Sequence, residues 1–419
     1  MTVHAGTLIV GASQAGVQLA VSLRDLGEQG PITLIGDEKH APYQRPPLSK
    51  SFLGGDVGVE QLWLRSPEYL ADQAISVITG ALVETVELAG SGPGGVARTA
   101  GGGEVHFDRL ALTVGARPRR LAVPGADLDG VTYLRTADDA AKLRQMQRDA
   151  QSVVVVGGGF IGLEAAAVAR AQGKAVTVVE AADRLIGRAV APVVSDFYHA
   201  AHTRRGVTVR LDTSVSALTG RKCQVESVEL SDGSAIPADL VIVGIGVEPR
   251  TELADQLGLT CDGGIVVDSH ARTSNPGVVA AGDCTVQPNP VTGRGMVRLE
   301  SVQNAIGQAK TAAATLAGRV EPSTAVPWFW SDQFDLKLQI ARLSPGHDDF
   351  VVRGNPEQES FSVLCYRDGA LLAVDAVNAA ADYMAVRKAL AQGSTILAED
   401  ARNPGVALRD RIGPPTVSA

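Results

Sequence analysis

The sequence predicts an α/β protein with two Rossmann-like dinucleotide-binding domains. Two glycine-rich loops each follow an apolar strand and open a helix, and a Gly-Asp pair ends a further apolar strand later in the chain. The chain has 419 residues, and its hydrophobic content is 45%, so it is globular and exceeds a single hydrophobic core. Two or three domains are therefore expected.

The first loop lies in the segment TLIVGASQAG. Gly11, Ser13 and Gly16 occupy the three positions of GxGxxG, with Ser13 in place of the middle glycine. Small residues there let the backbone approach a pyrophosphate, and the start of the following helix stabilises its charge. The next strand, expected over 32–35, leads to Asp37, which can accept hydrogen bonds from ribose hydroxyls. A glycine-rich turn in an ordinary α/β unit is the alternative interpretation.

The second loop matches the pattern without substitution, in the segment VVVVGGGFIGLEAAAVARAQGKAVTVVE. Gly157, Gly159 and Gly162 follow a four-valine strand, a helix is expected over 160–171, and the strand after it delivers Glu180. A carboxylate at this position bonds the 2′-hydroxyl of NAD and repels the extra phosphate of NADP. The sequence therefore favours NADH, although two arginines shortly after Glu180 leave NADPH open.

A third element indicates that one of the two dinucleotides is FAD. In TSNPGVVAAGDCT a strand expected over 277–281 ends at Gly282 and Asp283, where an acid can bond the ribityl chain of a flavin. A generic Gly-Asp turn is the alternative. Further on, Ser301 can cap a helix that runs to Gly318, and a helix start aimed at flavin N1 would stabilise the negative charge of the reduced ring.

Bulk properties exclude other classes of protein. The net charge of −8 argues against a nucleic-acid-binding protein, and no run of eighteen apolar residues predicts a membrane span. The histidines show no metal-ligand spacing, so no metal is expected. No two cysteines form a CxxC pair, and their spread is typical of a reducing, cytoplasmic compartment. The four are Cys223, Cys261, Cys284 and Cys365.

The segment APYQRPPLSKSFLGG predicts a short helix that begins at Pro47 and ends at Gly54 and Gly55. Lys50 then falls in the first turn, where the helix dipole disfavours a cation. A solvated surface lysine is the plain interpretation.

The sequence resembles the FAD-dependent pyridine-nucleotide reductases, and more narrowly the ferredoxin reductases of oxygenase systems, the putidaredoxin reductase type. The resemblance is carried by the two loops and by YQRPPLSK, LALTVGARPR, VIVGIGVEPR, VVAAGDC, LESVQNAIGQA and VPWFWSDQFDLKLQIA. It implies a glutathione-reductase-like fold with an FAD-binding domain over 1–115 and 248–322. An NADH-binding domain is implied over 116–247, and a C-terminal α/β interface domain over 323–419.

The resemblance also implies roles for single residues. It places Lys50 against the flavin, Glu164 and then Glu300 as its acidic partners at the nicotinamide pocket, and Trp330 beside the flavin ring. Helix capping for Glu164 and plain core packing for Trp330 are the alternatives. The implied FAD contacts, beyond the first loop's Gly11, Ser13 and Gly16, are Ala15, Asp37, Arg45, Lys50, Val83, Arg135, Asp283 and Val302.

The lack of cysteine in PYQRPPLSKSFLGG decides the expected acceptor, because dithiol relatives carry a redox CxxxxC there. Electrons are expected to leave the flavin directly, one at a time, toward an acidic [2Fe–2S] ferredoxin that serves a P450 or ring-hydroxylating oxygenase. An NADH oxidase or quinone reductase, and an NADH-sensing protein like apoptosis-inducing factor, remain alternatives. A basic docking face is expected. Its candidate residues are Arg117, Arg119, Arg120, Arg387 and Lys388.

Overall fold

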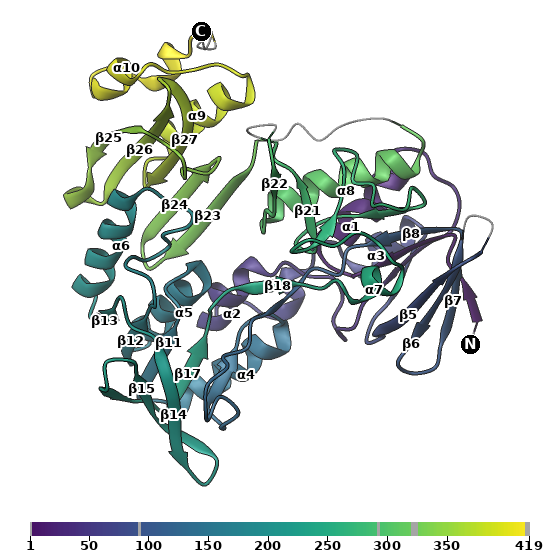
Figure 1. The fold of residues 1–419 in the computed structure, drawn as a ribbon, viewed down its shortest axis with the longest axis horizontal. Coiled ribbons are helices and arrows are strands. Elements are labelled where there is room, and N and C mark those ends of the chain that lie inside the picture. Colours follow the sequence, from purple (N-terminus) through teal and green to yellow (C-terminus); the bar gives the residue numbers. More distant parts are fainter. Residues whose placement is uncertain (1, 91–93, 291–293, 320–325, 415–419) are drawn as a thin grey trace. The chain divides into compact units, whose positions relative to one another are not determined.

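The computed structural model describes residues 2–90, 94–290, 294–319 and 326–414. The chain divides into two compact units that are not continuous in sequence. Unit 1 contains 1–45, 57–117 and 247–325, and unit 2 contains 46–56, 118–246 and 326–419. The expected domain boundary at 322 and 323 lies outside the described residues. Figure 1 traces the chain from purple to yellow.

A five-stranded parallel sheet, in the order β20-β8-β2-β3-β4, forms the centre of unit 1. Its strands are apolar and largely buried, as expected of a parallel sheet covered on both faces. Alternate side chains of these strands enter two different core clusters. The strands are β2 (Thr7–Val10), β3 (Ile32–Ile35), β4 (Ile75–Ile78), β8 (Arg109–Leu112) and β20 (Val278–Ala280).

Two helices cover one face of this sheet and a second sheet covers the other. Helices α1 (Gln14–Asp25) and α8 (Val302–Leu316) pack together over alanine-rich faces on the first side (Figure 1). On the other side lies a four-stranded sheet in the order β1-β7-β6-β5. Its strands are β1 (Thr2–His4), β5 (Val83–Leu88), β6 (Gly95–Thr99) and β7 (Glu104–Phe107). The other elements of unit 1 are η2 (Val59–Leu62), α3 (Pro67–Asp72), α7 (Glu252–Gln256), β19 (Ile265–Val266), β21 (Thr285–Pro288) and β22 (Met296–Val297).

Unit 2 contains a second five-stranded parallel sheet, in the order β10-β17-β11-β12-β13. Helices α4, α5 and α6 pack against this sheet through one hydrophobic cluster. A small antiparallel sheet of β14, β15 and β16 packs against it through a second cluster. The bounds are β10 (Val131–Tyr133), α4 (Ala137–Asp149), β11 (Ser152–Val156), α5 (Phe160–Ala171), β12 (Ala175–Val179), α6 (Pro192–Arg204), β13 (Val207–Arg210), β14 (Val215–Arg221), β15 (Gln224–Leu230), β16 (Ala235–Pro237) and β17 (Leu240–Val243). Strands β9 (Ala116–Pro118) and β18 (Val247–Pro249) pair with each other.

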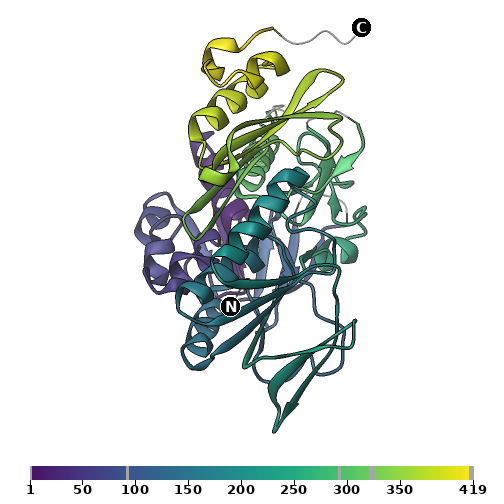
Figure 2. The same cartoon turned by 90° about the vertical axis from the view of Figure 1, so that its left-hand side faces the viewer.

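The C-terminal part of unit 2 is an antiparallel sheet in the order β23-β24-β27-β26-β25. One face shares a core cluster with α5 and α6, and the other face packs on α9 (Figure 2). The bounds are β23 (Trp328–Gln333), β24 (Leu336–Ala341), β25 (Asp349–Asn355), η3 (Pro356–Gln358), β26 (Ser360–Arg367), β27 (Ala370–Val377), α9 (Ala380–Ala391), α10 (Ala398–Arg402) and η4 (Leu408–Arg411).

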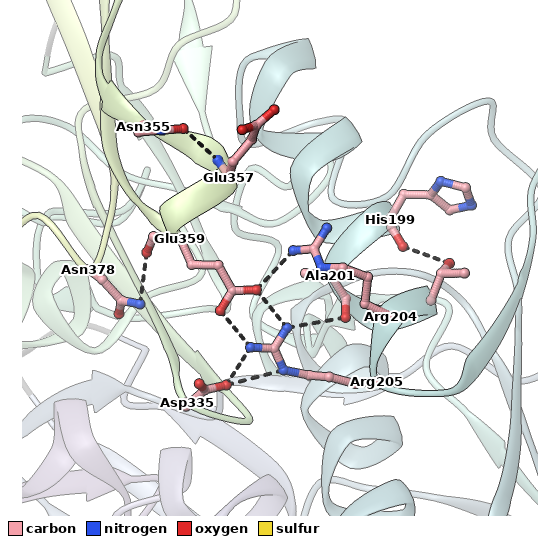
Figure 3. A network of polar contacts seen from close by, with 10 residues as sticks. His199, Ala201, Arg204, Arg205, Asp335, Asn355, Glu357, Glu359 and Asn378 are labelled. Carbon is pink, nitrogen blue, oxygen red and sulfur yellow. Dashed lines mark hydrogen bonds and ion pairs between the residues drawn. The ribbon is translucent and has the colours of Figure 1, made fainter.

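A network of ion pairs also joins α6 to this sheet (Figure 3). The Arg205 guanidinium donates to both carboxylate oxygens of Glu359, at 2.9 and 2.7 Å, and to Asp335 at 2.6 Å. Arg204 adds a second cation to Glu359 at 2.8 Å. The hydrogen bonds from Arg205 are the main reason why the pKa of Glu359 falls to about 2.

The predicted helix of the PPLSK segment is broken in two. A 3₁₀ turn, η1 (Pro46–Ser49), begins one residue earlier than predicted, and a short helix, α2 (Ser51–Gly54), follows it. Lys50 separates them, because its backbone (φ −124°, ψ −112°) is not helical. Gly55 ends α2 in the left-handed region at φ +92°, as the sequence predicts. No helix among the described residues is long and apolar enough to span a membrane.

Candidate functional site

The two glycine loops have nearly the same backbone geometry. The first glycine of each, Gly11 and Gly157, has a positive φ, of +117° and +108°. A Cβ atom at these positions would lie 2.1 Å from the carbonyl oxygen of Thr113 and 2.4 Å from that of Gly244. Both clashes are with the backbone just beyond the end of a neighbouring strand, β8 or β17, so only glycine fits.

The third and middle positions explain why one substitution is tolerated. At Gly16 and Gly162 a Cβ would lie 2.1 and 2.2 Å from the carbonyl oxygen of the loop's own first glycine. At Gly159, the middle position, a Cβ would meet no atom within 4 Å. Ser13 occupies the equivalent position, at the N-cap of α1, and its side chain makes no capping bond. The serine therefore leaves the phosphate-binding geometry of the first loop intact.

An acidic residue follows the second strand of each nucleotide unit, as the sequence predicts. Asp37 forms an ion pair with Arg250 at 2.9 Å within unit 1. Glu180 accepts hydrogen bonds from the backbone N–H groups of Gly158, at 2.6 Å, and Ala182, at 2.8 Å. Glu180 therefore lies directly at the second glycine loop, with its carboxylate held by main-chain donors.

The Gly-Asp pair of unit 1 lies between the first loop and α8. Gly282 has φ +90°, and a Cβ there would lie 3.2 Å from the Cβ of Ala15. Its N–H donates to the side chain of Gln308 on α8 at 2.8 Å. Three segments that are distant in sequence therefore meet at Gly282, beside Asp283. This convergence fits the contacts that an FAD pyrophosphate and ribityl chain need.

Helix α8 begins as the sequence predicts. Ser301 is its N-cap and accepts a hydrogen bond from the N–H of Asn304 at 3.1 Å, and Val302 is its first residue. Glu300, just before the cap, is exposed and pairs with Arg298 at 2.7 Å. Val83 is buried at the start of β5 in the same unit.

Arg45 is a further predicted FAD contact in unit 1. It pairs with Glu38 at 2.5 Å, and it is also attracted electrostatically by Asp283. Tyr43 donates a hydrogen bond to Glu38 as well. The sequence reasoning missed Glu38, which orients Arg45, although its place beside Asp37 at the strand end was a usable signal.

The predicted pair of Lys50 and Glu164 forms in unit 2. The Lys50 ammonium lies 2.8 Å from Oε2 of Glu164, and the side chains are 18% and 2% exposed. Lys50 also donates to the carbonyl of Pro46 at 3.1 Å. The interpretation of Glu164 as a helix-start acid is wrong, because it is the fifth residue of α5, beyond the first turn, and fully buried. Lys50 is therefore the charge that balances it.

Two serines complete the surroundings of Glu164, and the sequence reasoning missed both. Ser49 donates to Oε2 at 2.5 Å, and Ser331 donates to Oε1 at 2.6 Å. Burial raises the pKa of Glu164, whereas Lys50 and the two hydroxyls oppose that rise. Ser331 lies on β23 next to Trp330, so alternation along the strand turns the Trp330 ring to the opposite face.

The remaining predicted residues have other partners. Trp330 is half-buried, and its ring lies 5.5 Å from that of Trp328. Arg135 belongs to unit 2, where its N–H donates to Asp139.

The basic residues considered for docking are partly engaged. Arg117 pairs with Glu248 and Glu252, Arg120 stacks on Tyr133, and Arg387 stacks on Trp328.

All four cysteines are free thiols. Cys284 and Cys365 are fully buried, and burial raises the pKa of Cys284 to about 12 and also raises that of Cys365. Cys223, which is exposed, lies in the β14–β15 turn. The cysteines therefore supply no disulfide, and the two buried ones are poor nucleophiles.

Comparisons with known proteins agree with this geometry. Rhodocoxin reductase of Rhodococcus erythropolis is 46% identical over 94% of this chain and 91% of its own. The crystal structure of the ferredoxin reductase for the CYP199A2 system of Rhodopseudomonas palustris superposes with a TM-score of 0.92 at 42% identity, covering 97% and 99% of the two chains. The covalent putidaredoxin reductase–putidaredoxin complex gives 0.92 at 37% identity, covering 97% of each.

Two family descriptions match the chain in consecutive segments. Residues 328–412 match the reductase C-terminal family, which corresponds to the antiparallel sheet and the helices after it. Residues 6–309 match a second, larger family. This segment contains both glycine loops, the Lys50–Glu164 pair and the Gly-Asp pair. The chain therefore belongs to the pyridine nucleotide-disulphide oxidoreductase family.

Proposed function

We propose that this protein is an NADH-dependent, FAD-containing ferredoxin reductase that serves a P450 or ring-hydroxylating oxygenase. The observation that carries the proposal is a buried lysine–glutamate pair beside the second glycine loop, in a chain whose four cysteines are free. The relatives with this architecture are reductases named for ferredoxins and related carriers. We also propose that the protein acts in the cytoplasm.

The two glycine loops are proposed to bind different cofactors. The first loop, the Gly-Asp pair and the start of α8, all in unit 1, fit FAD, and the second loop with Glu180, in unit 2, fits NADH. A three-domain division, with a C-terminal interface domain, is part of this proposal. The proposed FAD contacts are Gly11, Ser13, Ala15, Gly16, Asp37, Arg45, Lys50, Val83, Arg135, Asp283 and Val302, and the proposed NADH contacts are Gly157, Gly159, Gly162 and Glu180.

The chemistry divides between cofactor and protein. Bound FAD would supply the chemistry that links a two-electron hydride donor to a one-electron acceptor. The N-terminus of α8 stabilises negative charge near Val302 by roughly 0.3 to 2 kcal/mol, as other helix starts do. Lys50 supplies a positive charge, and Glu164 fixes the position of that charge. Glu300 and Trp330 are proposed to bound the nicotinamide pocket and the flavin ring.

Glu180 selects NADH over NADPH. Its carboxylate exchanges part of its bonding to Gly158 and Ala182 for the 2′-hydroxyl of the adenosine ribose. A 2′-phosphate would place like charges in contact. Because the four cysteines are free thiols, the electrons pass from the flavin to the ferredoxin without a disulfide.

The test mixes purified, FAD-loaded protein with NADH, a [2Fe–2S] ferredoxin and cytochrome c, and follows reduction of the cytochrome. Ferredoxin-dependent turnover that persists after thiol alkylation is expected. Glu180→Ala should lower the preference for NADH over NADPH at least tenfold, and Glu226→Ala, an exposed surface change, should not. Rapid NADH consumption with oxygen or a quinone alone, or a long-lived NADH complex with slow turnover, would reject the proposal.

A further inference from the structure

We infer that Ser331, Gln333 and His202 are positioning residues that hold Glu164 as a carboxylate beside Lys50. The inference rests on the proposed function, because it explains how the active-site lysine keeps its charged partner. Its evidence is a continuous chain of hydrogen bonds inside unit 2, running from the buried acid of α5 across β23 to α6.

The chain of bonds has three links beyond Glu164. Ser331 Oγ donates to Glu164 Oε1 at 2.6 Å, and Gln333 Nε2 donates to Ser331 Oγ at 3.1 Å. Gln333 Oε1 then lies 2.8 Å from Nε2 of His202. Ser331, Gln333 and His202 are each 0% exposed, so water does not compete for these bonds.

Each hydrogen bond in this series is donated in the direction of Glu164. The amide of Gln333 uses its NH₂ group on Ser331, so its oxygen must accept from His202. His202 is therefore the tautomer with its proton on Nε2. Burial lowers the pKa of His202 to about 4, which keeps the ring neutral at physiological pH. A neutral donor chain that ends on a carboxylate stabilises the ionised form of the acid.

β23 explains why this arrangement is possible. Ser331 and Gln333 are two residues apart on one strand, so both side chains project from the same face. Trp330 and Asp332 project from the opposite face, and they are half-buried. The strand therefore carries a proposed flavin neighbour on one side and the support of Glu164 on the other.

The other charged and titratable groups around the chain do not replace these donors. Lys50 and Ser49 act on the second oxygen, Oε2. Tyr198, one turn before His202 on α6, stays neutral because burial and the charges of Asp332 and Glu164 raise its pKa. Arg205 is committed to Glu359 and Asp335, and its charge lowers the pKa of His202. Oε1 of Glu164 therefore depends on Ser331.

The experiment is an infrared titration of the full-length, FAD-loaded protein, in which Glu164→Gln identifies the carboxyl band of Glu164. Ser331→Ala removes one donor to a charged group, so the pH at which the protonated band appears should rise by about one to two units. Ser331→Thr keeps the hydroxyl and should restore the wild-type value. Ser195→Ala, a buried serine of α6 that donates to a backbone carbonyl, is the matched control and should cause no change.

His202 extends the test to the far end of the chain and keeps it decisive if Ser331→Ala does not fold. His202→Leu should shift the band in the same direction by less than Ser331→Ala, and His202→Gln, which can still donate, should shift it less than His202→Leu. The acid limb of NADH-dependent flavin reduction should move together with the band. An unchanged band in the foldable donor-removing variants would overturn the inference. A wild-type protein that does not reduce ferredoxin would instead reject the proposed function, and the band would still decide this inference.

Discussion

Two buried carboxyl groups in the described part of unit 2, Glu164 and Asp375, have different surroundings. Glu164 is 2% exposed and has a cation and two hydroxyl donors. Asp375 on β27 is 0% exposed, and one of its oxygens accepts from the N–H of Ala191 at 2.8 Å. Its other oxygen has no hydrogen-bond partner in the part of the chain that the structure describes.

The difference shows what a buried charge requires. Burial raises the pKa of Asp375 to about 7, and a single backbone donor opposes it only partly. Glu164 has three groups that favour its charged form, all supplied by side chains from distant segments. We therefore expect the carboxyl group of Asp375 to exchange its proton near neutral pH, whereas the groups around Glu164 favour its charged form and oppose the rise of its pKa on burial.

Removing the cation from Glu164 should have the largest effect. Lys50→Met leaves a buried carboxylate without its counter-charge, and the free energy of unfolding should fall by about 3 to 5 kcal/mol. Urea denaturation of the FAD-loaded protein measures the loss. The double variant Lys50→Met/Glu164→Gln should recover most of the stability but not the activity. A single variant as stable as the wild type would show that the pair is not desolvated as described.

Asp375→Asn should stabilise the protein increasingly as the pH rises. The folded-state pKa of Asp375, about 7, lies above its ordinary value of 3.8, so the folded protein binds the extra proton between these values. The contribution of Asp375 to the free energy of unfolding is therefore present at low pH and is lost as the pH rises through about 7. The advantage of Asp375→Asn should grow by about 2 kcal/mol between pH 5 and pH 8, measured by urea denaturation. An advantage that does not change with pH would contradict the assignment.

Glu359 should show the opposite pH dependence with a smaller amplitude. Its folded-state pKa, about 2, lies below the ordinary 4.5, so its stabilisation is present above 4.5 and is lost as the pH falls toward 2. Glu359→Gln should lower the stability by about 1 kcal/mol at pH 7, since the pair is partly exposed to solvent. Thermal unfolding from pH 7 down to pH 3 should show the two proteins converging. Parallel curves would contradict the prediction.

Arg204 should contribute least. Its side chain is 52% exposed, and it duplicates the contact that Arg205 makes with Glu359. Arg204→Gln should change the free energy of unfolding by less than about 0.5 kcal/mol, and 1 M salt should remove even that difference. A larger loss, equal to that of Arg205→Gln, would show that the network in Figure 3 acts as one unit.

Local features of the chain were predictable from the sequence. The second loop is followed by a helix over Phe160–Ala171 and a strand over Ala175–Val179, as predicted, because glycine spacing and apolar periodicity act within a few residues. The family, the cofactor class and the capping role of Ser301 were also confirmed. The break at Lys50 was not predictable, since a tertiary ion pair, not local propensity, accompanies it.

The partners of Glu164 were harder to predict because they come from two segments that are far from it in the chain. Ser49 precedes Glu164 by 115 residues, and Ser331 follows it by 167. In the sequence, Ser331 and Gln333 belong to the polar half of WFWSDQ, in which three aromatic residues precede three polar ones. A run of three polar residues predicts a solvent-exposed end of the strand, whereas the structure buries Ser331 and Gln333 beneath α6.

The early segment 46–56 belongs to unit 2, although the chain on both sides of it belongs to unit 1. On the ribosome, Lys50 emerges long before its partners. Roughly 280 further residues must be translated before Ser331 exists, which takes about 15 to 55 seconds at ordinary elongation rates. During that interval Ser331 cannot donate to Glu164, so the buried carboxyl group of the nascent chain lacks one of its hydrogen bonds. We expect chaperones to be needed most at this stage of synthesis.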